Sequence, residues 1–233
     1  MTEVRSYQDT DNLADRLREV PYEPILRIIG RVAEREGIEA YAVGGMVRDV
    51  LLDRATTDLD FVTVGPGTGI ELAEAAGEEL GGRTAHVYPK FGTAAIRIPT
   101  EEAFPEDHTD DTLVLEFVAA RKESYRSHSR KPEVEAGTLE DDQYRRDFTV
   151  NAMAIHLTPD RFGALIDPFD GRRDLERRTI DTPLDPEETF EDDPLRMIRA
   201  ARFATQLEFR VSDRVFDAMG RSEERRVGKE CRL

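Results

Sequence analysis

The sequence predicts an α+β fold: a mixed sheet with flanking helices up to about residue 160, followed by an α-helical region. Three observations lead to this prediction. Short apolar runs of strand length alternate with segments of helical apolar spacing, glycine and proline turns separate them, and the clearest periodicity beyond residue 160 is helical. We therefore assign residues 1–160 to a head domain and residues 161–220 to the start of a helical region.

The first elements alternate between helix and strand. Apolar residues at helical spacing predict a helix over 24–33, and Gly37 follows as a stop signal. The apolar run 40–43 has the length of a strand. It ends at the pair Gly44-Gly45, after which residues 46–52 are predicted to form a helix.

The next elements complete the predicted sheet. Residues 58–64 are rich in β-branched and aromatic side chains and predict a strand, and residues 69–80 predict a helix. Residues 85–88 and 93–98 are predicted to pair as a hairpin, and 113–119 predicts a further strand.

The second half is more polar and more helical. Residues 121–137 predict a mobile loop, and Thr138 opens a capping-box pattern that predicts a helix to about Ile155, so that His156 would lie at a helix end. A turn at 167–171 and a short helix over 173–177 follow. The last helix is predicted over 193–207, and four of its apolar residues are expected to pack: Leu195, Ile198, Ala201 and Phe203.

The composition argues against some classes of function and does not by itself indicate one. The chain contains neither an apolar run long enough to cross a membrane nor a secretory leader pattern, so we expect a cytoplasmic protein that does not bind membranes. Its net charge of −16 argues against a broad phosphate-binding surface, because polyanion affinity comes from lysine and arginine. A nucleic-acid enzyme is therefore indicated only by local motifs.

The last residues, 221–233, differ from the rest of the chain. Residues 221–231 match the translation of a common short-read sequencing adapter, so we interpret the segment as an artefact and exclude it from the fold prediction. The alternative is an ordinary charged helix end. Cys231 is the only cysteine, so without this segment neither disulfides nor thiolate metal sites are expected. The gene product is then expected to continue beyond the sequence given.

A glycine pair and two aspartates carry the clearest chemistry. Gly44-Gly45, between a strand and a helix, lets the backbone approach a ligand and directs free N–H groups at an anion such as a triphosphate. Asp58 and Asp60 are two residues apart on a predicted strand, so both carboxylates face the same way. Mg²⁺ takes one or two carboxylates from a protein and completes its shell with water and phosphate oxygens. Each feature alone is weak, since Asp-x-Asp also occurs on solvated strand edges.

Four motifs in order resemble one family. Residues 43–49 with 58–60 resemble the signature of polymerase-β-type nucleotidyltransferases, and three further motifs are similar to class II CCA-adding enzymes and bacterial poly(A) polymerases. The further motifs are Arg145–Met153, Asp167–Leu175 and Asp192–Phe203. The resemblance implies a polymerase-β-like head followed by a helical neck, with Mg²⁺ held by Asp58 and Asp60. It departs from the family at Asp192, where relatives usually carry glutamate.

The resemblance also implies roles for other side chains. Gly44, Gly45 and Arg48 would hold the triphosphate. Asp193 and Arg196 would pair with the incoming base, for which their acceptors and planar donor fork are suited. The remaining implied nucleotide-binding residues are Arg146, Asp147, Asn151, Arg199 and Arg202. Spacing alone would also fit a solvated or phosphate-binding stripe at Arg196, Arg199 and Arg202.

Four more polar side chains in or near these motifs are assigned roles from the sequence. Glu116 is a candidate third catalytic carboxylate beside Asp58 and Asp60, and an ion pair with Arg121 or Lys122 is the equally weighted alternative. Asp49 is expected to order the glycine turn. In the motif around Arg146, Asp147 is expected to fix an arginine, and Asn151 to bind a ribose hydroxyl or the backbone.

The implied reaction is attack of a tRNA 3′-hydroxyl on the α-phosphate of CTP or ATP with release of pyrophosphate. A poly(A) polymerase and an A-only or CC-only adding enzyme share every motif and stay open as alternatives. A nucleotide-binding head without efficient turnover is the alternative from another class. None of the four scattered histidines is followed by aspartate, so a His-Asp phosphohydrolase is not supported.

Overall fold

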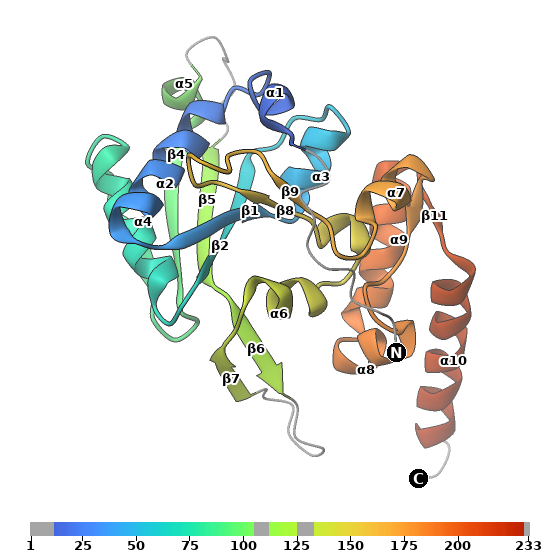
Figure 1. Ribbon diagram of the computed structural model, residues 1–233. Coiled ribbons are helices and arrows are strands. Elements are labelled where there is room, and N and C mark those ends of the chain that lie inside the picture. The colour runs from blue at the N-terminus through green and yellow to red at the C-terminus, as the bar shows by residue number, and fades with distance from the viewer. Residues whose placement is uncertain (1–11, 105–111, 125–132, 231–233) are drawn as a thin grey trace.

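The fold is built on a seven-stranded mixed sheet (Figure 1). The structure is a computed structural model and describes residues 12–104, 112–124 and 133–230. β2 and β5 run parallel and every other neighbouring pair in this sheet is antiparallel. The predicted mixed sheet is therefore confirmed. The strands, in spatial order, are β3 (His86–Tyr88), β4 (Thr93–Pro99), β5 (Thr112–Ala119), β2 (Asp58–Val64), β1 (Glu39–Val43), β8 (Ala154–His156) and β9 (Leu165–Ile166).

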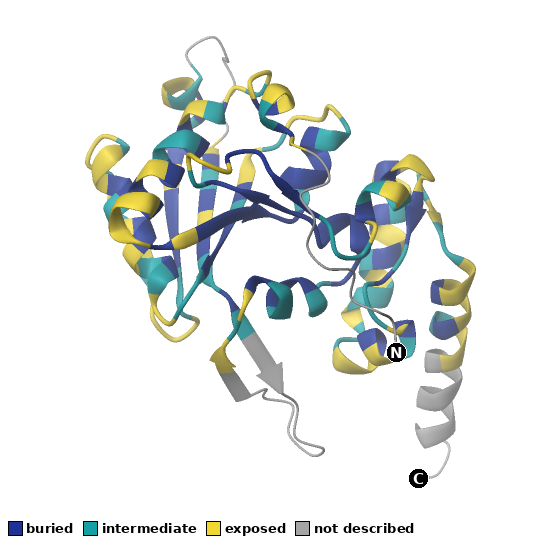
Figure 2. Cartoon of the chain, in the orientation of Figure 1, coloured by how far each residue is buried: buried dark blue, intermediate teal, exposed yellow. Residues whose placement is uncertain are grey.

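Two long helices cover one face of this sheet. α2 (Glu23–Glu36) and α4 (Thr68–Glu79) pack on each other and on the strands, and α2 buries one apolar stripe that includes Leu26 and Ile29 (Figures 1 and 2). On β2, Leu59 and Phe61 are fully buried in the same core. Because side chains alternate along a strand, Asp58 and Asp60 are presented on the other face. The shorter helices of this half are α1 (Ala14–Leu17), α3 (Gly45–Leu51) and α5 (Thr100–Ala103).

The segment after β5 differs from the prediction. Instead of a loop over 121–137, the chain forms the antiparallel strands β6 (Arg121–Ser124) and β7 (Glu133–Ala136), and the residues between them lie outside the described part. The predicted helix to Ile155 is also wrong, since α6 (Leu139–Tyr144) is short, although its capping box is confirmed. A 3₁₀ turn (η1, Thr149–Asn151) follows, and β8 then pairs with β1, so that tertiary strand pairing replaces the helix.

His156 therefore lies on β8, not at a helix end. It is buried, and its ring is 4.4 Å from the ring of Tyr41 on β1. The expectation that it serves packing is consistent with this position. The sheet also continues past residue 160 through β9, so the predicted head boundary stays a prediction.

Helices dominate the C-terminal part. After α7 (Gly171–Glu176), the strands β10 (Thr179–Ile180) and β11 (Arg210–Val211) pair in parallel, and β11 lies beside the remaining helices (Figure 1). These helices are α8 (Pro186–Asp192), α9 (Leu195–Leu207) and α10 (Asp213–Glu230). Whether they correspond to the family's neck stays a prediction. Across the described residues, no helix combines the length and apolar content needed to cross a membrane.

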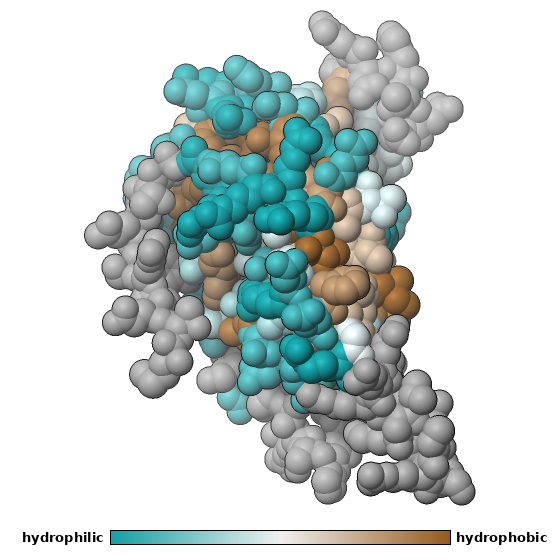
Figure 3. Space-filling model, turned by 90° about the vertical axis from the view of Figure 1, so that its right-hand side faces the viewer, coloured by the Kyte–Doolittle hydropathy of each residue, from teal (hydrophilic) through white to brown (hydrophobic). Residues whose placement is uncertain are grey.

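The predicted packing of α9 is only partly correct. Phe203 is buried and packs edge-on against Phe148, with ring centres 5.7 Å apart. Leu195 and Ile198, however, are 63% and 70% exposed, and Ala201 is exposed as well. Figure 3 looks onto this side of the molecule, where apolar atoms reach the surface among hydrophilic ones. The helix buries a stripe turned away from the predicted one, formed by Ala200, Phe203 and Leu207.

Candidate active site

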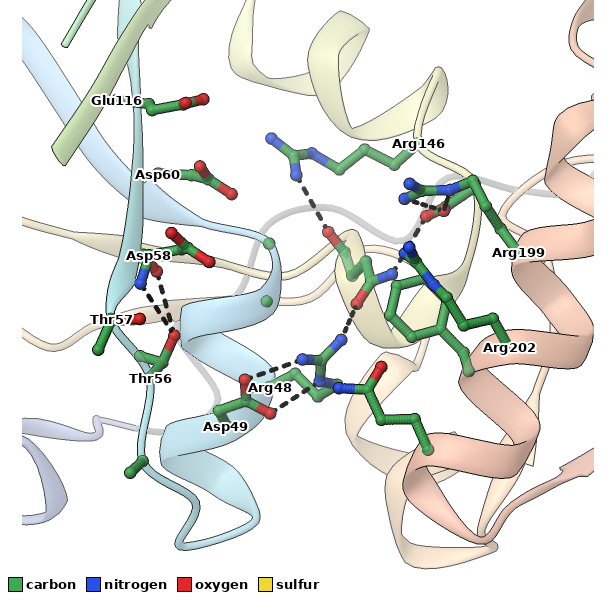
Figure 4. A pocket seen from close by; sticks show the side chains of 17 residues that line it. Arg48, Asp49, Thr56, Thr57, Asp58, Asp60, Glu116, Arg146, Arg199 and Arg202 are labelled. Atoms are coloured by element: carbon green, nitrogen blue, oxygen red, sulfur yellow. Dashed lines mark hydrogen bonds and ion pairs between the residues drawn. The ribbon is translucent and has the colours of Figure 1, made fainter. Parts of the chain in front are cut away.

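A cavity of about 710 Å³ lies between the sheet, the start of α3 and α9 (Figure 4). It brings together most of the residues that the sequence singled out. The predicted residues among its lining are Gly44, Gly45, Arg48, Asp58, Asp60, Glu116, Arg146, Asp147, Asn151, Arg199 and Arg202. Asp193 and Arg196 do not line it.

Three carboxylates form one wall of this cavity. Asp58 and Asp60 come from β2, and Glu116 is the register partner of Asp60 on the parallel neighbour β5. Their side chains point to the same side of the sheet in Figure 4. The prediction that Asp58 and Asp60 face the same way is thus correct, and the structure places Glu116 beside them.

The carboxyl group of Asp60 is hard to ionise. Burial raises its pKa to about 6; Arg146 opposes this shift, whereas Glu116, Asp58 and Asp142 add to it. A cation bound at this wall would relieve that repulsion, because an opposite charge within a few ångströms favours the carboxylate form.

The donor set suits Mg²⁺. Among the described residues no cluster of three or more Asp, Glu, His or Cys side chains forms a ready-made metal cage. Mg²⁺ does not need one, since it commonly binds one or two carboxylates and keeps water and substrate phosphate oxygens as its other ligands. Asp58 and Asp60 therefore fit a Mg²⁺ ion that arrives with a phosphorylated substrate.

Gly44 lies between the acidic wall and a basic side chain. Its backbone has φ of 75° and ψ of −135°, a conformation that side-chain-bearing residues rarely adopt. A Cβ atom here would lie 2.9 Å from Nη1 of Arg146 and 3.3 Å from Oδ2 of Asp60. Glycine at this position therefore lets the backbone turn into α3 while Asp60 and Arg146 stay close.

A chain of hydrogen bonds joins α3 to α9 along the floor of the cavity. Arg48 donates to both carboxylate oxygens of Asp49, at 2.9 and 2.8 Å, and to Oδ1 of Asn151 at 2.8 Å. Asn151 donates to Oδ1 of Asp147 at 3.2 Å, and Oδ2 of Asp147 accepts from Nε of Arg199 at 2.7 Å. All but Arg199 are buried.

These contacts refine three expectations. Asp147 does fix an arginine, and that arginine is Arg199, far away in sequence. The carboxylate of Asp49 holds Arg48, whose guanidinium lies next to Gly45, and the expected role of Asp49 in ordering the glycine turn stays a prediction. The side chain of Asn151 bonds two other side chains, where a ribose or the backbone was expected.

Asp142 on α6 is a site residue that the sequence interpretation missed. It is fully buried and accepts hydrogen bonds from Arg145 and from Nε of Arg146, the latter at 2.9 Å. Burial alone would raise the pKa of Asp142, but Arg146 and Arg145 outweigh it and lower that pKa. The i, i+3 and i, i+4 spacing on a helix was the available signal. Asp142 thereby holds the Arg146 guanidinium at the cavity.

The α9 side of the cavity is basic and aromatic. The Phe203 ring lies 5.4 Å from Cζ of Arg48, 5.4 Å from Cζ of Arg199 and 4.8 Å from Cζ of Arg202. These are cation–π distances. Phe203 was predicted only as a packing residue, so its place in the cavity lining was also missed.

Asp193 and Arg196 make structural contacts in this conformation. Oδ1 of Asp193 accepts from the backbone N–H of Leu195 at 3.0 Å, where α9 begins. Arg196 donates to the backbone carbonyl of Arg145 at 2.6 Å and to that of Thr189 at 3.4 Å. Their role in base recognition stays a prediction.

This fold, with paired aspartates facing a glycine turn, defines a nucleotidyltransferase-type head. Residues 40–181 match the family described as poly A polymerase head domain, and the chain belongs to that family.

The relatives are tRNA nucleotidyltransferases. The chain is 42% identical over 175 residues to the A-adding tRNA nucleotidyltransferase of Aquifex aeolicus, covering 75% of this chain and 19% of that protein. It is 38% identical over 198 residues to the CCA-adding enzyme of Geobacillus kaustophilus, covering 83% of this chain and 42% of the relative.

Solved structures show the same likeness. A CCA-adding enzyme in an apo form superposes with a TM-score of 0.78 at 32% identity, covering 92% of this chain and 48% of that one. A tRNA nucleotidyltransferase complexed with a primer tRNA and an incoming ATP analog gives a TM-score of 0.70 at 37% identity, covering 87% and 52%. The chain thus spans about half the length of these structures, and less of some curated relatives.

Proposed function

We propose that this chain is the catalytic head of a Mg²⁺-dependent nucleotidyltransferase that adds C, A or both to the 3′ end of tRNA. One observation carries the proposal. Asp58 and Asp60 lie side by side on β2 and share one cavity with the Gly44–Gly45 turn and with Arg146. The names of the relatives supply the substrate class, since they add A, CC or CCA to tRNA.

Each part of the cavity suits one part of the reaction. The turn at Gly44–Gly45 and the Arg48 guanidinium face the space in which a triphosphate would lie, and Arg146 lies across from the carboxylates. The 3′-hydroxyl oxygen of the RNA bonds to the α-phosphorus, the hydroxyl loses its proton, and the bond to pyrophosphate breaks. The protein contributes mainly positioning and charge neutralisation, as in other phosphoryl transfers.

Asp58 and Asp60 would hold the metal, and Glu116 stands next to them as a third carboxylate. Bound Mg²⁺ would supply Lewis-acid stabilisation of the attacking and leaving oxygens. The family resemblance gives Asp193 and Arg196 the selection of the base. Arg199 and Arg202, which already line the cavity, suit contacts to the nucleotide.

The test is a transfer assay with the chain as given. Transcripts of one tRNA that end before, within and after the CCA sequence are incubated with labelled CTP or ATP and Mg²⁺. Labelled product supports an enzyme, and the bases added to each transcript distinguish CCA, CC, A-only and poly(A) addition. Asp60→Ala is expected to abolish transfer and to spare nucleotide binding measured without metal.

Asp160→Asn is the matched control, because Asp160 is an exposed aspartate outside the cavity lining. It is expected to transfer at the wild-type rate. Nucleotide binding without any transfer, at several Mg²⁺ and Mn²⁺ concentrations, would show a binding head and would refute the proposed activity of this chain.

A further inference from the structure

A second, smaller hollow opens against the same carboxylates. Its volume is about 150 Å³, room for little more than one base or ribose, and it shares Asp60, Glu116 and Arg146 with the larger cavity. The rest of its lining comes mostly from the strands on the β3 side of the sheet: Val43, Tyr88, Thr93, Ala94, Ala95, Phe117 and Val118.

Strand register explains why these groups meet. Asp60 pairs with Glu116, and Glu116 pairs with Ala95. Two residues along β4, Thr93 pairs with Tyr88 on β3. Since a step of two residues returns to the same face of a sheet, Tyr88 and Thr93 share the face that carries the carboxylates.

Tyr88 stands out among the aromatic residues of the sheet. Phe61 and Phe117 are fully buried on the opposite side, whereas Tyr88 is 46% exposed on the edge strand β3. It therefore adds little to the core and offers an aromatic surface at the rim of the hollow. Thr93, beside it, carries a hydroxyl that can donate or accept a hydrogen bond.

We propose that this hollow receives the base of the 3′-terminal nucleoside of the RNA strand that is extended, stacked on Tyr88, with the attached ribose at the edge of the hollow beside Thr93. The inference rests on the proposed function. In-line displacement requires the attacking hydroxyl to approach the α-phosphate opposite the leaving pyrophosphate. The larger cavity holds the glycine turn and the arginines, and the hollow meets the same two carboxylates from the β3 side.

The charge of the chain favours stacking as the means of holding that nucleoside. A net charge of −16 argues against a broad phosphate-binding surface on the protein. Stacking of a base on an aromatic ring does not need positive charge, and it tolerates any base. An RNA end that changes from one base to the next during addition is suited to such a contact.

Tyr88→Ala tests the hollow, with Tyr88→Phe as the variant that keeps the ring. Loss of one stacked base is expected to raise the KM for the tRNA acceptor on the order of tenfold. The KM for CTP or ATP, and kcat at saturating acceptor, are expected to stay within about twofold of wild type, and Tyr88→Phe to restore acceptor affinity. Phe91→Ala is the matched control, since Phe91 is 69% exposed at the turn of the same hairpin and lines neither cavity.

Equal effects of Tyr88→Ala and Phe91→Ala, or an effect on the nucleotide KM instead of the acceptor KM, would overturn the inference. A second measurement separates it from the proposed function. A tRNA acceptor-stem hairpin with a 3′-terminal 5-iodocytidine is irradiated with the chain, and the attached peptide is mapped by mass spectrometry. Attachment at Tyr88 supports the hollow even if the chain transfers nothing. Attachment only elsewhere, or none, refutes it even if the chain is active.

Discussion

Replacing Asp60 by asparagine is expected to stabilise the fold and to abolish nucleotide transfer. The side chain lies in the acidic wall, where burial and then the neighbouring Glu116 and Asp58 oppose its ionisation more than Arg146 assists it. Asparagine has nearly the same shape and no charge to bury. The variant therefore removes the unfavourable charge together with a proposed metal ligand.

The magnitude follows from the pKa of Asp60, about 6 in the folded protein against an ordinary 3.8. Between these two values the folded state retains a proton that the unfolded state has lost. Stability therefore falls as pH rises from about 4, and the loss is complete above about 6. At ~1.4 kcal/mol per unit, the ionised group costs on the order of 2–3 kcal/mol at pH 8. For a chain of this size, the variant should melt roughly 4–12 °C higher.

The assay compares thermal and urea unfolding of wild type, Asp60→Asn and Asp160→Asn between pH 4.5 and 8 without divalent ions. Only the difference between wild type and Asp60→Asn isolates this group, because other carboxyl groups titrate in the same range. The difference should grow through pH 5–6 and then level off. A difference that is flat with pH, or matched by Asp160→Asn, would show that Asp60 is not destabilising when ionised. Added Mg²⁺ should raise the melting temperature of wild type but not of Asp60→Asn.

Three further substitutions test other parts of the site. Gly44→Ala is expected to cost about 1–3 kcal/mol in urea unfolding and to weaken nucleotide binding, because its φ is positive and its methyl group meets Arg146; unchanged binding would contradict this role. Asp142→Asn should destabilise by about 3 kcal/mol, measured against Asp160→Asn, because it removes a buried carboxylate that pairs with the partly buried Arg146. Arg196→Ala should mainly change the ratio of kcat/KM for CTP and ATP; equal loss with both nucleotides would argue against base selection.

Local patterns predicted what depends on local sequence. β2 begins and ends where β-branched and aromatic residues placed it, at Asp58 and Val64. The glycine pair ends β1 and begins α3 as expected. These elements position the acidic wall, so the central part of the site could be predicted before any tertiary contact was known.

Tertiary contacts determined the features that local sequence patterns did not predict. Helix signals after Thr138 are overridden beyond Tyr144, because β8 completes its hydrogen bonds on β1. The sequence also does not show which carboxylate each arginine binds. Arg199 reaches Asp147 across a long stretch of chain, and the packing of Phe203 on α9 against Phe148, the neighbour of Asp147, brings the two together. The exposed side chains of α9 were mispredicted for a related reason, since helical periodicity defines a stripe but not the surface that the stripe contacts.

The charge of the larger cavity explains why nucleotide binding here should become tighter when a divalent cation is present. Arg48 and Arg199 are already paired with Asp49 and Asp147, so they offer a phosphate hydrogen bonds but little uncompensated charge. Metal ions held by Asp58 and Asp60, as proposed, would supply the missing positive charge. The cavity lining contains four arginines and five carboxylates. The arginines are Arg48, Arg146, Arg199 and Arg202, and the carboxylates belong to Asp49, Asp58, Asp60, Glu116 and Asp147. With the proposed cations bound, this lining would carry net positive charge, so the proposed binding of a triphosphate would not require a broad basic surface on this acidic chain.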